Sequence, residues 1–252
     1  GANMGLETEI LAFAVLAFFI AGTIKGVVGL GLPTTSVGLL GQFVDPRVAI
    51  ALVTMPMVVS NLWQVWREGD VLGTIRRFTP FWAPLVVLLY MTAFVTASVS
   101  DLILLTVIGS VIVTFASISL AWTPPALPPG WDRPAQITAG SIAGVLGGLT
   151  SIWSPPMIVY FLAARVDKDT FVRASGVLLM LGTGPMVAGY WTAGILTSEL
   201  ALISATLVIP TLIGFTVGEW LRRRLDTERF RRVVLWIFLA MGLNILRRAV
   251  MG

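Results

Sequence analysis

The sequence contains no cysteine and no histidine, and charged residues make up only 12% of its 252 positions. These absences exclude disulfide bonds, thiol chemistry, cysteine or histidine metal ligands, and acid–base catalysis by an imidazole ring. The glycines form no nucleotide-binding signature. We therefore expect a protein that is not an enzyme, with no catalytic residue, no cofactor and no metal site.

Apolar side chains are what the chain has in excess. Hydrophobic residues make up 56% of it and the mean hydropathy is +0.90, whereas soluble domains average about 45–50% apolar and about 25% charged residues. The composition predicts an all-α polytopic membrane protein. The net charge of +4 would suggest nucleic acid in a soluble protein. Here the arginines flank apolar runs, as the positive-inside rule places them, so we expect membrane lipids as partners and no nucleic acid.

Six segments are long and apolar enough to cross the hydrocarbon core, which requires roughly 20 residues. They lie at about 47–66, 78–97, 101–122, 171–191, 198–218 and 230–250. Two further apolar regions, at about 6–44 and 135–164, are interrupted by GVVGLGLP (26–33) and GGLTSIWSPP (147–156). Proline-rich residues 123–134 form a stiff linker between the halves.

The two halves share a spacing of glycine, proline and aspartate, which predicts an internal duplication. The first repeat covers 1–122 and the second covers 135–252, and each consists of an interrupted helical hairpin followed by three transmembrane helices. A shift of 122 residues aligns Gly22 with Gly144, Gly26 with Gly148, Pro33 with Pro155, and Asp45 with Asp167.

The distribution of lysine and arginine predicts how the interrupted regions are threaded. If each is a hairpin that enters and leaves by the same face, most of the basic residues fall on one face, which the positive-inside rule identifies as cytoplasmic. Each half then crosses an odd number of times, so the two structural repeats are inverted, as in many secondary transporters. Arg247 and Arg248 do not fit this arrangement. The basic loops lie at about 67–77, 122–134, 165–173 and 219–232.

Irregular backbone at membrane depth is tolerated only inside the protein or beside a polar cavity. We therefore expect the two interruptions to meet near the middle of the membrane. Short helices should begin around Thr34 and around Met157, and the free N–H groups of a helix start attract anions. The pair of interruptions thus predicts a binding site for a small anion.

Lys25 precedes the first interruption, and Gly147 holds the related position in the second half. A lysine in a transmembrane segment costs roughly 2.5–3.5 kcal/mol and is usually kept for a partner or a pathway. The interpretation we favour is a counter-charge to an anionic substrate. The alternatives are a side chain that reaches the interface, or one that pairs with Asp45 or Asp101.

The other candidate substrate-binding residues surround the interruptions. Gly29 and Gly31 permit a sharp reversal and a close approach of the ligand, and Trp153 could stack beside the cavity. The hydroxyl donors are Thr34, Thr35, Ser36, Thr150, Ser151 and Ser154. Small polar residues also pack membrane helices, so a structural role stays open for them.

Three further features have mainly structural interpretations. The G-x-x-x-G pairs formed by Gly22 with Gly26 and by Gly144 with Gly148 predict close helix packing. Asn61 lies near the expected cytoplasmic end of its span and is interpreted as interfacial, with a place on the transport path as the alternative. The basic run LRRRLDTERFRRV (221–233) is expected to contact lipid head groups.

AGTIKGVVGLGLPTTSVGLL (21–40) and its echo AGVLGGLTSIWSPPMIVYFL (143–162) resemble the paired glycine-rich motifs of the TauE/SafE sulfite exporter family, also called toluene sulfonate uptake permeases. The resemblance extends over nearly the whole chain. It implies a carrier in the bacterial inner membrane for sulfite, for organosulfonates such as sulfoacetate, or for related small organic acids. The second copy departs from the family pattern at 150–154, where many members have a longer glycine run followed by proline.

The residues and the resemblance together predict a secondary transporter that exports small sulfur-containing anions by alternating access. The alternatives are an anion channel, a carrier for another small organic carboxylate, and a membrane scaffold. The sequence leaves the coupling ion and the oligomeric state open.

Overall fold

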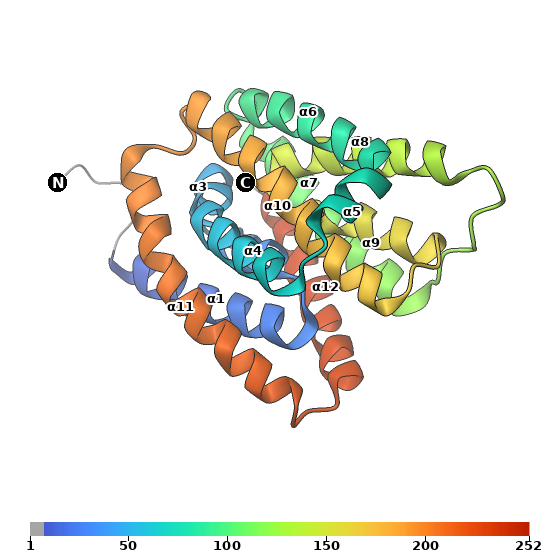
Figure 1. Ribbon diagram of the computed structural model, residues 1–252. Coiled ribbons are helices and arrows are strands. Elements are labelled where there is room, and N and C mark those ends of the chain that lie inside the picture. Colours follow the sequence, from blue (N-terminus) through green and yellow to red (C-terminus); the bar gives the residue numbers. More distant parts are fainter. Residues whose placement is uncertain (1–7, 252) are drawn as a thin grey trace.

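The computed structural model describes residues 8–251, and these residues form twelve helices and no strand (Figure 1). The prediction of an all-α protein is therefore confirmed. The start of the hairpin predicted at about 6–44 lies partly outside the described residues. The helices are α1 (Thr8–Val28), α2 (Leu32–Leu40), α3 (Pro46–Leu52), α4 (Thr54–Glu68), α5 (Val71–Arg77), α6 (Thr79–Thr96), α7 (Asp101–Ala121), α8 (Asp132–Thr150), α9 (Ser154–Ala163), α10 (Lys168–Thr192), α11 (Ser198–Arg222) and α12 (Thr227–Met251).

Seven stretches of helix are long and apolar enough to cross a membrane, so the chain is a multi-pass membrane protein. Six of them are the predicted spans, now seen as α3 with α4, α6, α7, α10, α11 and α12. The seventh is α1, which the sequence assigned to the first hairpin. Helix α5 falls in a region predicted as a loop.

Both predicted interruptions are present, and they recur at the same spacing. Helices α1 and α8 end at Val28 and Thr150, and helices α2 and α9 begin at Leu32 and Ser154. Both boundaries differ by the 122 residues that align the glycines. The short helices start a little earlier than predicted because Pro33 and Pro155 lie within their first turns, where a missing N–H costs no intrahelical hydrogen bond.

Glycines bring α1 against α11 and α8 against α6, and each pair runs side by side in Figure 1. A methyl group on Gly22 would lie 2.1 Å from the carbonyl oxygen of Thr211, and one on Gly148 would lie 2.6 Å from the backbone nitrogen of Ala93. No larger side chain fits at either position without moving the partner backbone. The expectation that the G-x-x-x-G pairs pack helices is confirmed.

Helices that hold corresponding places in the two halves cross in opposite directions. Helix α4 runs antiparallel to α10, and helix α7 runs antiparallel to α12. In both pairs a later residue of one helix meets an earlier residue of the other. The contacts that define these directions are Asn61–Thr183 and Gln64–Gly176 for the first pair, and Gly109–Leu246 and Val113–Gly242 for the second.

The four basic loops lie together on one side of the molecule, here called the loop face. An ion pair of 2.5 Å joins Arg67 to Glu219, and one of 3.8 Å joins Arg173 to Asp70. The backbone N–H of Leu127 donates to the carbonyl of Ala163 at 3.0 Å, which ties the proline-rich linker to the end of α9. The loop face therefore collects most of the basic residues.

Arg248, which the charge distribution left unexplained, has a structural role on the opposite side. Its guanidinium donates to the carbonyls of Gly41 and Val44, each at 2.8 Å. These carbonyls follow the C-terminus of α2, where backbone oxygens lack intrahelical partners and a positive charge is favourable. Arg47 acts similarly by donating to Asp101 and to the carbonyl of Val99.

Candidate functional site

An inner cavity of about 250 Å³ lies between the two interruptions. Gly31, which ends the first interruption, and Ser154, which begins α9, both line it. The rest of the wall is mostly apolar and comes from α1, α7, α9, α10 and α12. Residues from both halves of the chain thus share one cavity.

Each interruption lies beside the midpoint of a long neighbouring helix. Gly31 approaches Phe238, which is near the midpoint of α12, and the ring of Trp153 packs against Gly182, which is near the midpoint of α10. Because a 25-residue helix is about as long as the membrane is thick, the irregular backbone lies well inside the membrane. Residues 151–153 are buried there, whereas residues 29–31 are half-buried beside the cavities.

Lys25 is buried, with 3% of its surface exposed, and its partners are neutral. Its Nζ donates to Asn61 Oδ1 at 2.8 Å and to Ser60 Oγ at 3.1 Å, and Asn61 Nδ2 donates onward to Thr183 Oγ1 at 3.0 Å. This network joins α1 to α4 and α10.

The two alternative interpretations of Lys25, a side chain that reaches the interface and one that pairs with a carboxylate, are wrong. A side chain that reached the interface would be exposed. No carboxylate among residues 8–251 pairs with it, because Asp45 and Asp101 contact Arg47 instead. The role of substrate counter-charge stays a prediction. The interfacial interpretation of Asn61 is also wrong, since this residue is 1% exposed.

Sequence reasoning missed Ser60, which is a partner of Lys25, and Thr183, which is a partner of Asn61. A signal was present for Thr183, because the shift of 122 residues aligns it with Asn61. The amide of Asn61 and the hydroxyl of Thr183 therefore hold equivalent positions in the two halves, and they contact each other where α4 crosses α10. Ser175 on α10 was missed as well, and its hydroxyl is buried without a partner among the described residues.

Lys25 and Gly29 do not line the inner cavity. They border a smaller cavity of about 70 Å³, together with Arg67, Glu219 and Arg222 at the loop face. Four of the predicted site residues are therefore divided between two spaces on opposite sides of the end of α1, with Gly31 and Ser154 in one and Lys25 and Gly29 in the other. Ile24 of the same helix lines the larger one.

Three predicted hydroxyls line neither cavity and are engaged within the protein. Ser36 Oγ donates to the carbonyl of Leu32 at 2.9 Å, and Thr150 Oγ1 accepts from the N–H of Ile152 at 3.0 Å. Ser151, whose φ of 62° is left-handed, has its hydroxyl 3.1 Å from Tyr190 Oη. These contacts favour a structural role in holding the interruptions.

Thr34, Thr35 and Trp153 differ from these residues because their polar atoms have no partner among the described residues. All three residues are at most 2% exposed. A buried donor without a partner costs about 1–3 kcal/mol. Although they line neither cavity in this conformation, they offer unused hydrogen bonds beside the two helix starts.

The two helix starts offer different numbers of backbone donors. The first four N–H groups of a helix have no intrahelical partner, and proline has no N–H. In α2 only Pro33 falls in this set, whereas α9 has both Pro155 and Pro156 there. The start of α2 is therefore the better anion-binding end.

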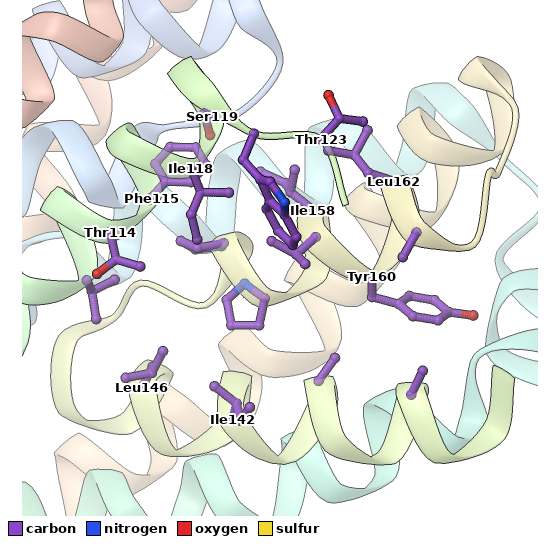
Figure 2. Close-up of a pocket in the computed structure, with 18 of the residues that line it drawn as sticks. Thr114, Phe115, Ile118, Ser119, Thr123, Ile142, Leu146, Ile158, Tyr160 and Leu162 are labelled. Atoms are coloured by element: carbon purple, nitrogen blue, oxygen red, sulfur yellow. The ribbon is translucent and has the colours of Figure 1, made fainter. Parts of the chain in front are cut away.

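A larger space, here called the vestibule, adjoins the inner cavity and measures about 1080 Å³. Figure 2 shows side chains of α7, α8 and α9 gathered around it, including Phe115, Ile142 and Ile158. Five residues line both spaces: Phe115, Ser119, Ile158, Leu162 and Arg231. The vestibule also reaches the linker at Trp131 and the start of α12.

The chain matches the family described as Sulfite exporter TauE/SafE over residues 14–245, a region that contains both interruptions and both cavities. Neither a curated protein nor a solved structure matches it. The match agrees with the paired glycine-rich motifs and with the multi-pass fold. The chain belongs to the TauE/SafE sulfite exporter family and is a membrane transporter.

Proposed function

We propose that the protein is a secondary transporter that exports a small sulfur-containing anion, either sulfite or an organosulfonate such as sulfoacetate, across the bacterial inner membrane. The observation that carries this proposal is the inner cavity, where Gly31 and Ser154 bring the interruptions of both halves to one space near the middle of the membrane. Family membership supports the substrate class.

Recognition of the anion would combine three kinds of donor. The start of α2 supplies free N–H groups, and Thr34 and Thr35 supply hydroxyls that have no partner among the described residues. Lys25 supplies an amino group held by neutral partners; it borders the smaller cavity in this conformation, so it would face the anion only after the halves move. Hydrogen bonds to charged groups contribute about 1.5–3 kcal/mol each, so a few of them would hold a small oxyanion.

Transport would occur by alternating access between two inverted repeats. Support comes from helix boundaries that recur after 122 residues and from the antiparallel pairs α4 with α10 and α7 with α12. Rocking of one half against the other would open the site first to the loop face, which we assign to the cytoplasm, and then to the other side. A membrane potential that is negative inside favours anion export by about 2.3 kcal/mol per charge at 100 mV.

Counterflow in proteoliposomes tests this proposal. Vesicles preloaded with unlabelled sulfite should accumulate labelled sulfite transiently, and a panel of sulfate, sulfoacetate, taurine and carboxylates should rank the substrates by competition. Saturable uptake with counterflow is the expected result. A flux that never saturates and shows no counterflow would instead indicate an anion channel. Preference for a carboxylate over every sulfur compound would indicate the organic-acid alternative.

A further inference from the structure

Arg231 occupies the boundary between the vestibule and the inner cavity. It lies near the start of α12 and lines both spaces, and it is the charged residue in the described wall of the inner cavity. Arg232, its neighbour, lines the vestibule alone. The sequence assigned both residues to a run that contacts lipid head groups, but Arg231 lines both the vestibule and the inner cavity.

The side chain of Arg231 has one ion-pair partner, and that contact is easily exchanged. Its Nη1 lies 3.1 Å from Glu228 Oε1, and the two side chains are 37% and 69% exposed. Pairs of this exposure contribute little to stability. A guanidinium has five N–H donors in a fixed fork that matches the oxygens of a carboxylate or sulfonate. An incoming oxyanion can therefore replace Glu228.

The surroundings of Arg231 strengthen such an exchange. Phe115, Ile158 and Leu162 form the apolar wall that both spaces share, and Ser119 adds a hydroxyl donor to the same wall. Charge interactions are stronger beside apolar walls than in open water. Gly31 and Ser154 lie farther along, in the inner cavity that Arg231 borders.

We propose that Arg231 forms an entry subsite for small oxyanions on the loop-face side, where the anion binds before it reaches the interruptions. Glu228 competes with the anion for the guanidinium and so keeps the subsite from holding it tightly. This proposal rests on the proposed transport function and adds a specificity-determining residue outside the central site. It also identifies the vestibule as the route by which anions enter from the loop face.

The test compares three variants in proteoliposomes with labelled sulfite. Transport is measured separately from the loop face and from the opposite face, and a cysteine introduced at Ser98 in all samples reports the orientation of the protein. Arg231→Gln should raise the apparent KM from the loop face about tenfold and change the KM from the opposite face much less. Glu228→Gln should lower the loop-face KM. Arg232→Gln is the matched control and should shift KM less than twofold.

Equal shifts for Arg231→Gln and Arg232→Gln would overturn the proposal, because they would indicate general attraction by surface charge, which salt screens. An unchanged loop-face KM in Arg231→Gln, or a rise in KM in Glu228→Gln, would also overturn it. If Arg231→Gln does not fold, Arg231→Lys keeps the charge without the fork and should still raise the KM. Failure of the transport function itself would be distinct, since the unsubstituted protein would then show no saturable sulfite transport.

Discussion

The two interruptions hold equivalent positions in the two halves, yet they are built from different residues. The first reverses at Gly29 and Gly31, whose φ angles of 91° and 102° are left-handed. The second reverses at Ser151, which is held by Tyr190, and is followed by the buried ring of Trp153. The backbone of the first interruption is open, whereas the second is filled by the ring of Trp153 and held by the hydrogen bond between Ser151 and Tyr190.

This difference indicates that the two interruptions have different roles. Around the second, Trp153 fills the space between Gly147 and Gly182, and the hydroxyls of Thr150 and Ser151 are engaged within the protein. Around the first, Thr34 and Thr35 keep unused donors, and Lys25 stands in place of Gly147. We infer that the second interruption mainly supports the site and that the first one mainly recognises the anion.

The largest expected effect concerns the support given by Trp153. Replacing Trp153 by Ala should destabilise the protein by about 3–5 kcal/mol, because it empties a closely packed space. Thermal unfolding in detergent measures the effect. Trp191→Ala, at a ring that is 55% exposed, is the control and should have little effect. Equal stability of the two variants would contradict the supporting role.

The next effect concerns the charge that only the first interruption has. Lys25→Gln should reduce transport roughly 10- to 100-fold, since a charge-assisted contact of about 1.5–3 kcal/mol is lost. Stability should hold, because Gln can still bond to Asn61 and a buried charge is removed. Lys168→Gln, at an exposed lysine, is the control. A well-folded Lys25→Gln variant with unchanged transport would remove Lys25 from the site, although the helix starts would remain.

A smaller effect is expected at Tyr190, which holds the second interruption. Its hydroxyl lies beside Ser151 and donates to the carbonyl of Gly148 at 2.9 Å. Tyr190→Phe should lower stability by about 1–2 kcal/mol while substrate affinity stays close to normal. Tyr90→Phe, at an exposed tyrosine, serves as the control. A large loss of affinity without a loss of stability would place recognition at the second interruption and so reverse the comparison.

The smallest effect concerns a single hydroxyl. Thr34→Val keeps the shape of the side chain and removes a donor that has no partner among the described residues. Anion affinity should fall about fivefold, the equivalent of ~1 kcal/mol, with stability unchanged or slightly raised. Ser36→Ala, whose hydroxyl already bonds within α2, should leave affinity unchanged. Competition binding measures both variants, and a larger effect at Ser36 would count against the assignment of donors.

Much of the fold could be predicted because membrane crossing imposes length and polarity on each segment. The six spans and both interruptions follow from apolar runs broken by glycine and proline. The short helix α5 was missed because its sequence, VLGTIRR, is short and basic and has the composition of a loop. The position of Arg248 was unexplained because its partners are the backbone carbonyls of Gly41 and Val44, just after α2, which carry no sequence signal.

The site was predicted less completely because it depends on contacts between distant helices. Apolar spans give no indication that Lys25 meets Asn61, since the rotation of α1 against α4 is set by packing. Arg231 could not be told apart from the other arginines of the basic run at 221–233, because the sequence does not show which of them reaches the inner cavity. A clue in the sequence was Asp226, a residue type that favours the N-cap of a helix; in the structure it accepts from the N–H of Arg229 at 3.2 Å at the start of α12.

Substrate protection of introduced cysteines tests the central claim most directly, because the chain has no cysteine of its own. Thr34→Cys places a thiol at the start of α2 in the first half, and Ser154→Cys places one in the wall of the inner cavity in the second half. Ser98→Cys places one far from both. If the anion binds between the interruptions, the best transported anion of the panel should slow labelling of both site cysteines by a small neutral thiol reagent. Protection of the two site cysteines should depend on the anion concentration in the same way, and labelling of Ser98→Cys should not change. Transport with no protection at either site cysteine would contradict the account.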